Sequence, residues 1–269
     1  MIWSIGEILN KIGLVPDSIG FAFSGGGARG FSHIGVLKAF EKFGIYPNVM
    51  SGVSAGSVAA VMYGAGLSPD DMFQCFKDLQ KISAFVSLKM PRNSLLKIDK
   101  FGKLIESWLP VRCLEELKIP TVVCATDFQY CKSIGWAKGE IVPRVLASCS
   151  IPIVFEPIKI NDRIYVDGGV LRNLPAWAIR KYCNTLYGIN CSPLNPVWED
   201  PMKHNIIEMA LRSYHLMSKT NMVNDAKMCD VLINLRGAHA IGTFEISKIE
   251  HTVSLGYETA CRILEKTLK

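Results

Sequence analysis

The sequence lacks any long apolar stretch. Its 269 residues contain no run of about 18 apolar residues, the length that crosses a bilayer as a helix. Residues 1–15 also lack the basic start and small-residue cleavage site of a secretory signal. Their apolar side chains recur at nearly helical spacing, which predicts a helix packed on the protein body, with a membrane-surface anchor as the alternative. We therefore expect a cytoplasmic protein, or one that is peripheral at a membrane surface.

Disulfide and metal-binding patterns are missing as well. The nine cysteines form no Cys-x-x-Cys pair, which argues for a reducing compartment and against both a disulfide framework and a zinc site. No carboxylate group has the spacing of a calcium loop, and no His-Glu-x-x-His occurs. The net charge of +6 is mild, and basic and aromatic residues do not alternate as in nucleic-acid binders. We expect no metal, no cofactor and no nucleic-acid partner.

The remaining pattern is that of a globular domain. With 49% hydrophobic residues and no internal repeats, residues 1–269 are predicted to form one domain. Short apolar runs typical of buried strands alternate with segments of helical period, such as Phe31 to Phe43. This alternation predicts an α/β fold with three layers, α/β/α, around a mainly parallel central sheet. The predicted strands are Ile19 to Phe23, Asn48 to Ser51, Thr121 to Ala125, Leu186 to Cys191 and Val231 to Leu235.

Other segments depart from that alternation. Residues 158–160 and 164–166 predict a hairpin. Residues 76–109 mix basic side chains with large apolar ones, which predicts either a solvated helical cap or an insertion whose surface faces a membrane. A helix is further predicted from Pro175 to Tyr182, with Asn173 as its candidate cap.

The most specific motif is the run Gly52-Val53-Ser54-Ala55-Gly56. It follows a predicted strand and precedes a predicted helix of small and apolar residues. A strand that turns sharply into a helix through Gly-x-Ser-x-Gly exposes the serine oxygen at the helix N-terminus, where the helix dipole favours negative charge. Ser54 is therefore a candidate nucleophile.

A glycine-rich loop, residues 24–30, lies between the first predicted strand and the following helix. Its consecutive backbone N–H groups can converge on an anion. That anion is either a dinucleotide pyrophosphate or the oxyanion that forms when a serine attacks an ester carbonyl. Nucleotide binding needs an acidic residue at the end of the second strand, and Ser51-Gly52 stands there instead, which favours the oxyanion.

The base that would activate the serine has two candidates. Among the five histidines, His239 follows a predicted strand as a triad histidine would, whereas His33 is expected to be structural. Asp167, in Asp167-Gly168-Gly169, leaves a strand onto two glycines and is the better candidate. A simple turn is the competing explanation for the Asp-Gly pair.

Taken in order, Gly25-Gly26-Gly27-Ala28-Arg29-Gly30, the Ser54 motif and Asp167-Gly168-Gly169 resemble the patatin-like phospholipases, over about residues 20–175. This family of lipid acyl hydrolases uses a Ser-Asp dyad. The resemblance implies Ser54 as the nucleophile and Asp167 as the base. It also implies an oxyanion hole and a residue that steers a phosphate headgroup. The implied oxyanion donors are the backbone amides of Gly25, Gly26 and Gly27, and the implied headgroup residue is Arg29.

The resemblance implies a serine esterase that cleaves acyl esters of phospholipids or lysophospholipids through an acyl-enzyme. Two alternatives stay open at this point. One is an acyltransferase that uses the same acyl-enzyme, and the other is a catalytically silent lipid-binding protein. Ser24 departs from the family, in which many members have aspartate at that position, but main-chain oxyanion donors do not depend on it.

Overall fold

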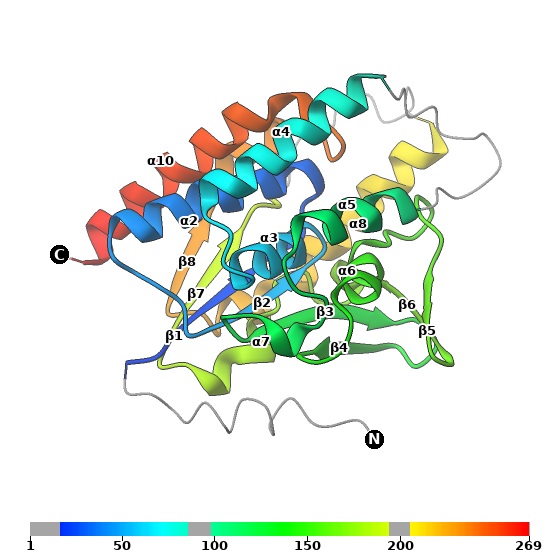
Figure 1. Cartoon of the computed structure of the whole chain (residues 1–269), viewed down its shortest axis with the longest axis horizontal. Helices are drawn as coiled ribbons and strands as arrows, with labels where there is room; N and C mark the ends of the chain where they lie inside the picture. The colour runs from blue at the N-terminus through cyan, green and yellow to red at the C-terminus, as the bar shows by residue number, and fades with distance from the viewer. Residues whose placement is uncertain (1–16, 86–97, 194–204, 269) are drawn as a thin grey trace.

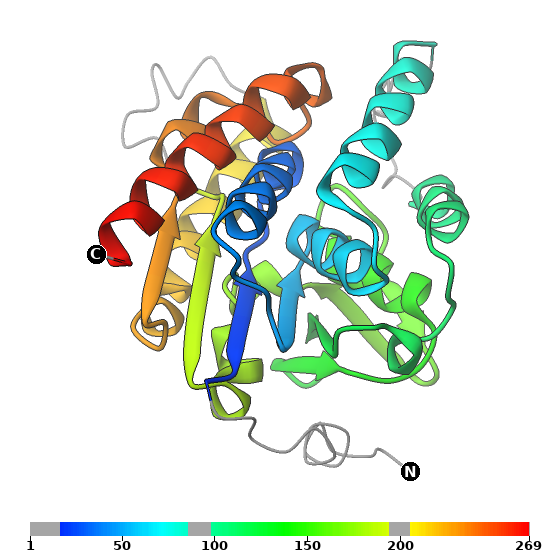
Figure 2. The same ribbon diagram turned by 60° about the vertical axis from the view of Figure 1, so that its left-hand side comes forward.

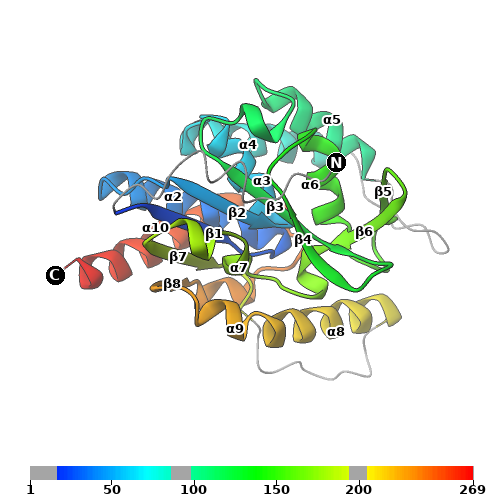
Figure 3. The same ribbon diagram turned by 90° about the horizontal axis from the view of Figure 1, so that it is seen from below.

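The computed structural model describes residues 17–85, 98–193 and 205–268. In this part of the chain, an eight-stranded sheet lies between two layers of helices (Figures 1 and 3). The predicted three-layer α/β/α fold is confirmed, whereas the predicted N-terminal helix lies outside the described residues. The strands are β1 (Ile19–Phe23), β2 (Val49–Val53), β3 (Thr121–Asp127), β4 (Lys132–Trp136), β5 (Ile158–Ile160), β6 (Arg163–Asp167), β7 (Thr185–Asn190) and β8 (Val231–Asn234).

The parallel part of the sheet contains β3, β2, β1, β7 and β8 in that spatial order, and Figure 2 shows several of these strands side by side. Central strands such as β2 are buried along their whole length. Because helices cover both faces of the sheet, each central strand needs apolar residues on both of its faces. This requirement explains the continuous apolar runs in the sequence. β4 was not predicted, because this half-exposed antiparallel strand has the sequence Lys-Ser-Ile-Gly-Trp and no such run.

One edge of β3 pairs with two strands placed end to end. β2 runs parallel to the first part of β3 and ends with Val53 opposite Cys124. β6 runs antiparallel to the second part, with Asp167 opposite Ala125. β4 pairs with residues of both parts and must therefore lie on the other edge. The carboxyl ends of β2 and β6 thus meet at neighbouring residues of β3, which brings Ser54 and Asp167 together.

The two helical layers differ in the number of helices described. One face of the sheet carries six helices, and the other carries α7, α8 and α9 (Figure 3). The helices of the first layer are α2 (Ser32–Lys42), α3 (Ala55–Gly64), α4 (Pro69–Phe85), α5 (Asp99–Trp108), α6 (Ile141–Cys149) and α10 (Ile249–Thr267). The helices of the second layer are α7 (Ala176–Ile179), α8 (Ile206–Asn221) and α9 (Val223–Ala226).

The helices α2 and α10 cross with their backbones in contact. A Cβ atom on Gly35 would lie 1.9 Å from the carbonyl oxygen of Val253, and one on Gly256 would lie 2.1 Å from that of Ser32. Any side chain at either glycine would force the helices apart. The crossing fixes α2, and with it the glycine-rich loop that precedes α2.

The segment 76–109 is described in two parts, and residues 86–97 of it lie outside the described ranges. Phe76 of α4 packs between Phe31 and Trp108, with ring centroids 5.0 and 5.1 Å away. The described parts of the segment therefore pack on the domain through their aromatic rings. Among the residues that the structure describes, no helix combines the length and the apolar character needed to span a bilayer.

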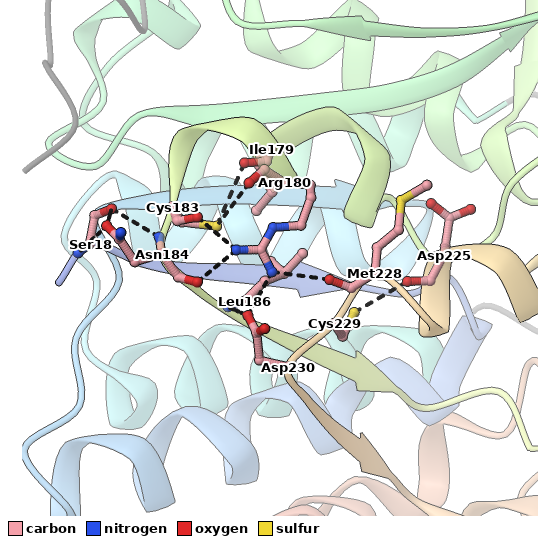
Figure 4. Close-up of polar contacts among 10 residues, drawn as sticks. All are labelled: Ser18, Ile179, Arg180, Cys183, Asn184, Leu186, Asp225, Met228, Cys229 and Asp230. Atoms are coloured by element: carbon pink, nitrogen blue, oxygen red, sulfur yellow. Dashed lines mark hydrogen bonds and ion pairs between the residues drawn. The ribbon is translucent and has the colours of Figure 1, made fainter. Parts of the chain in front are cut away.

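Arg180 connects the segments that precede β7 and β8 (Figure 4). Its guanidinium donates hydrogen bonds of 2.7 Å to the carbonyl oxygens of Cys183 and Asn184, and pairs with the carboxylate of Asp230 at 2.6 Å. These groups flank the amino ends of β7 and β8. Arg180 therefore stabilises the amino ends of parallel strands, whereas Ser54 follows the carboxyl end of β2.

Candidate active site

The turn between β2 and α3 carries Ser54 at its apex, as the motif predicts. The backbone of Ser54 has φ of 51° and ψ of −128°, a region that costs a non-glycine residue about 1–3 kcal/mol. The flanking glycines make this turn sterically feasible. A Cβ atom on Gly52 would lie 2.3 Å from the carbonyl oxygen of Gly56, and one on Gly56 would lie 2.4 Å from that of Phe23.

Ser148 of α6 holds this turn against β3. Its hydroxyl accepts a hydrogen bond from the Ser54 N–H at 2.8 Å and donates one to the carbonyl oxygen of Cys124 at 2.6 Å. Ser148 is fully buried. Because the Ser54 N–H is engaged with Ser148, it is not free to bind an oxyanion.

Asp167 is fully buried at the end of β6. Its Oδ1 atom accepts hydrogen bonds from the N–H of Gly169 at 2.8 Å and from the hydroxyl of Tyr214 at 2.9 Å. Burial raises the pKa of Asp167 to about 6, although the hydrogen bonds from Gly169 and Tyr214 and the nearby Ser54 hydroxyl lower it. A carboxylate whose pKa lies closer to neutral is a stronger general base than an exposed one.

The second carboxylate oxygen of Asp167, Oδ2, has no hydrogen-bond partner of good geometry in the described part of the chain. The Ser54 hydroxyl nevertheless lies near enough to this carboxyl group to lower its pKa. Catalytic hydrogen bonds are often long when no substrate is bound and shorten in the complex. Oδ2 is thus the oxygen that can accept the proton of Ser54.

The glycine-rich loop lies directly against the nucleophile. A Cβ atom on Gly25 would lie 3.0 Å from the Cβ atom of Ser54. The Gly25 N–H donates to the carbonyl oxygen of Asn173 at 3.2 Å. Within the described residues, the N–H groups of Gly26 and Gly27 have no hydrogen-bond partner. Two of the three predicted oxyanion donors are therefore free, and the third is engaged.

Arg29 lies beneath this loop and is only 5% exposed. Its Nε donates to the carbonyl oxygen of Gly26 at 3.1 Å, and its Nη2 lies 3.2 Å from Nε2 of His215 and 3.3 Å from Oγ1 of Thr243. Burial, together with the positive charge of Arg29, lowers the pKa of His215 to about 4, so His215 is neutral and accepts this hydrogen bond. These contacts support a role for Arg29 in holding the loop, and the headgroup contact stays a prediction.

An apolar cavity of about 380 Å³ opens beside Ser54. Its size falls within the range of small-molecule sites. The helices α4 and α5 provide one wall, so the segment 76–109 helps to form the cavity. The large apolar side chains of its lining include Phe76, Phe101, Leu104, Ile151, Phe155 and Phe244.

The two histidines considered from the sequence, His33 and His239, have other partners. His33 is fully buried, donates to the carbonyl oxygen of Ser24 at 3.0 Å, and has its pKa lowered to about 4 by burial. His239 donates to the carbonyl oxygen of Arg236 at 2.7 Å and does not line the cavity. Within the described ranges, no group of three or more His, Cys, Asp or Glu side chains is arranged to hold a metal ion.

Sequence reasoning missed several residues of this site. Tyr214 and His215 lie far from the three motifs in the sequence, and Ser148 lies between the Ser54 motif and Asp167 without a predicted role. Asn173 was predicted as the cap of α7, which is wrong, because Pro175 precedes that helix and no side chain caps it. The Asn173 amide instead donates to the carbonyl oxygen of Gly25 at 3.4 Å.

Together the fold and the site define an α/β protein with a serine at a strand-to-helix turn, next to a buried carboxyl group and a glycine loop. The sequence pattern of the patatin-like phospholipases matches residues 21–179. This match covers more than half of the chain, and the protein therefore belongs to the patatin-like phospholipase family.

Relatives of known sequence support this assignment. An uncharacterized NTE family protein of Mycobacterium tuberculosis is 30% identical over 159 residues, which are 58% of this chain and 44% of that protein. Patatin-like phospholipase domain-containing protein 6 of Mus musculus is 28% identical over 170 residues, which are 61% of this chain and 12% of that protein. The chain spans less than half the length of these relatives.

A solved structure shows the same fold. VipD from Legionella pneumophila superposes with a TM-score of 0.54 at 16% sequence identity, over 94% of this chain and 67% of that chain. The similarity extends beyond the region matched by the family pattern, so it includes the C-terminal strands and helices.

Proposed function

We propose that this protein is a lipid acyl hydrolase that cleaves fatty-acyl ester bonds of phospholipids or lysophospholipids. The register of β3 carries the proposal, because it brings Ser54 and the buried carboxyl group of Asp167 together beside an apolar cavity. Each methylene group moved from water into such a cavity contributes about 0.8 kcal/mol. A long acyl chain with its ester carbonyl at Ser54 is thus favoured over a short one.

The first half-reaction acylates the enzyme. Oδ2 of Asp167 accepts the Ser54 proton as the serine oxygen attacks the ester carbonyl carbon. The N–H groups of Gly26 and Gly27 bind the oxyanion, and one such donor is typically worth about 2.7–4 kcal/mol. Collapse of the tetrahedral intermediate expels the alcohol, which takes the proton from Asp167.

The second half-reaction releases the fatty acid. Asp167 accepts a proton from water as the water oxygen attacks the acyl carbon. The same amides bind the second oxyanion. The bond to the Ser54 oxygen then breaks, and Ser54 regains its proton from Asp167. Gly25 would provide a third donor only if its N–H left the carbonyl oxygen of Asn173 and donated to the oxyanion instead.

Ser54→Ala and Asp167→Asn should each abolish hydrolysis, because one removes the nucleophile and the other the base. The measurement is a panel of phospholipids and lysophospholipids assayed by product mass. His239→Ala is the control and should remain active, since His239 does not line the cavity. Full activity in Asp167→Asn together with loss in His239→Ala would indicate a histidine triad instead.

The same variants separate the two alternatives. A fluorophosphonate probe should label the protein and not Ser54→Ala, whereas a silent lipid-binding protein would show no such difference. An isotope-labelled acyl donor, given with and without a lysolipid acceptor, distinguishes transfer from hydrolysis by the product that carries the label. Contact with a membrane surface during these reactions stays a prediction.

A further inference from the structure

The helix α8 reaches the proposed base with a phenol group. We infer that Tyr214 is a positioning residue that fixes the orientation of the Asp167 carboxylate toward Ser54. The inference rests on the proposed function, since it assigns a role in the same reaction. Tyr214 lies outside the residues matched by the family pattern and outside the three motifs.

The first observation is the contact itself. The Tyr214 hydroxyl donates to Oδ1 of Asp167 at 2.9 Å, and the Gly169 N–H donates to the same oxygen at 2.8 Å. With Oδ1 held by two donors, Oδ2 is left for the Ser54 proton. The carboxylate is thus fixed in one of its two possible rotations.

The second observation is the close approach of Tyr214 to Gly169, which explains why a glycine stands at that position. A Cβ atom on Gly169 would lie 2.2 Å from the Tyr214 hydroxyl oxygen. Only glycine at this position lets the phenol approach the carboxylate. The second glycine of the motif is therefore required by a residue that follows it by 45 positions.

The third observation is that α8 holds the whole turn. The hydroxyl of Ser218 and the amide of Asn221 both donate to the carbonyl oxygen of Gly169 at 2.9 Å. Both residues follow Tyr214 on the same helix. A rigid helix with three contacts to this turn keeps the phenol and the carboxylate in register.

The charges around Asp167 allow a simple pH argument. Its titratable neighbours are Tyr214 from α8 and Cys149 from α6. Burial raises the pKa of both well above their usual range, so both stay neutral at physiological pH. No charged side chain among the described residues contributes to the pKa of Asp167. Tyr214 is therefore a permanent donor that favours the ionised carboxylate.

The test is the pH profile of Tyr214→Phe. In the unaltered protein, kcat/KM should rise with pH and level off above about 6, where Asp167 is ionised. The variant loses a hydrogen bond to a charged group, which should raise the pKa and move this limb up by about one to two pH units. Activity at pH 6 should fall about five- to fiftyfold and recover largely at high pH. The rate of fluorophosphonate labelling should follow the same shift.

Tyr182→Phe is the matched control. The Tyr182 hydroxyl is buried and has no hydrogen-bond partner in the described residues, so its removal should leave the pH profile unchanged. A Tyr214→Phe profile that superposes on the unaltered one overturns the inference, provided that the unaltered protein needs Ser54 and Asp167. If those two residues are dispensable, the proposed function fails first.

A double variant tests the geometry separately from turnover. Gly169→Ala should lower the thermal unfolding temperature, because the new methyl group meets the Tyr214 oxygen. Gly169→Ala combined with Tyr214→Phe lacks that oxygen and should regain part of the lost stability. A double variant no more stable than Gly169→Ala alone would show that Tyr214 does not occupy the space which Gly169 leaves.

Discussion

Asp167 carries the proposed base function in a place that disfavours its charge. Burial raises its pKa from the ordinary value of 3.8 to about 6. In the unfolded chain the carboxyl group is ionised at a lower pH than in the folded protein. The contribution of Asp167 to the stability of the folded state is therefore greatest below pH 4. This contribution is lost as the pH rises through 6. Catalytic use of this residue is thus opposed to stability.

Asp167→Asn removes this penalty, because the amide stays neutral. We expect the stability of the variant relative to the unaltered protein to improve by roughly 3 kcal/mol between pH 4 and pH 8, since each pKa unit corresponds to about 1.4 kcal/mol. Urea unfolding at the two pH values measures the difference. Taking the difference cancels any pH-independent effect of the amide. A relative stability that does not change with pH would contradict the burial of an ionised carboxylate.

At the residue scale, the positions of Ser54 and Asp167 could be predicted because each is defined by its immediate neighbours, whereas their catalytic roles stay proposals. Ser54 and Asp167 each stand beside glycines, and those glycines are explained by close contacts with backbone or side-chain atoms in the structure. Tyr214 and Ser148 stand in ordinary helical sequence. Their roles come from contacts with partners 47 and 94 positions away, which no local pattern encodes.

At the scale of elements, the buried parallel strands were predictable and the exposed edge strand was not. The predicted strand Ile19 to Phe23 matches β1 at both ends, because the strand coincides with a continuous apolar run bounded by serines. The predicted hairpin is confirmed as β5 and β6. Nothing in the sequence revealed that β6 would continue the line of β2 along β3, since strand pairing depends on the whole sheet.

The crossing of α2 and α10 predicts the sign of the stability change that Gly35→Ala causes. Helix propensity alone predicts that Gly35→Ala stabilises the protein by about 1 kcal/mol. The new methyl group would instead lie 1.9 Å from the Val253 carbonyl oxygen, and overpacking of this kind typically costs about 1–3 kcal/mol. We expect net destabilisation, measured by urea unfolding. Ser254→Ala on the exposed side of α10 is the control and should change stability little.

At the scale of the whole molecule, the site combines residues from both halves of the chain. The family pattern ends at residue 179, yet Tyr214, His215 and Thr243 contact the base or Arg29, and Phe244 lines the cavity. The resemblance weakens beyond about residue 175, which is why these contributions could not be predicted. The assignment of residues 1–269 to one domain stays a prediction.

The cavity should set the length of acyl chain that the enzyme accepts. Ala59 of α3 lines it, and Ala59→Trp should fill part of its volume. We expect a selective loss of activity on long-chain esters, with hydrolysis of a short-chain, water-soluble ester retained in the same variant. The ratio of the two kcat/KM values is the measurement. An equal loss on both substrates would show instead that the variant disturbs Ser54.

Val53, which precedes Ser54, and Asp167 lie opposite adjacent residues of β3, and this placement has a mechanical consequence. One peptide unit within a central strand, about 3.8 Å long, separates their anchoring positions, and it cannot stretch. The helices α4 and α5, which form a wall of the cavity, can shift or partly unfold without altering this spacing. Mild heating or low denaturant should therefore abolish selectivity for chain length before it abolishes reactivity toward small esters.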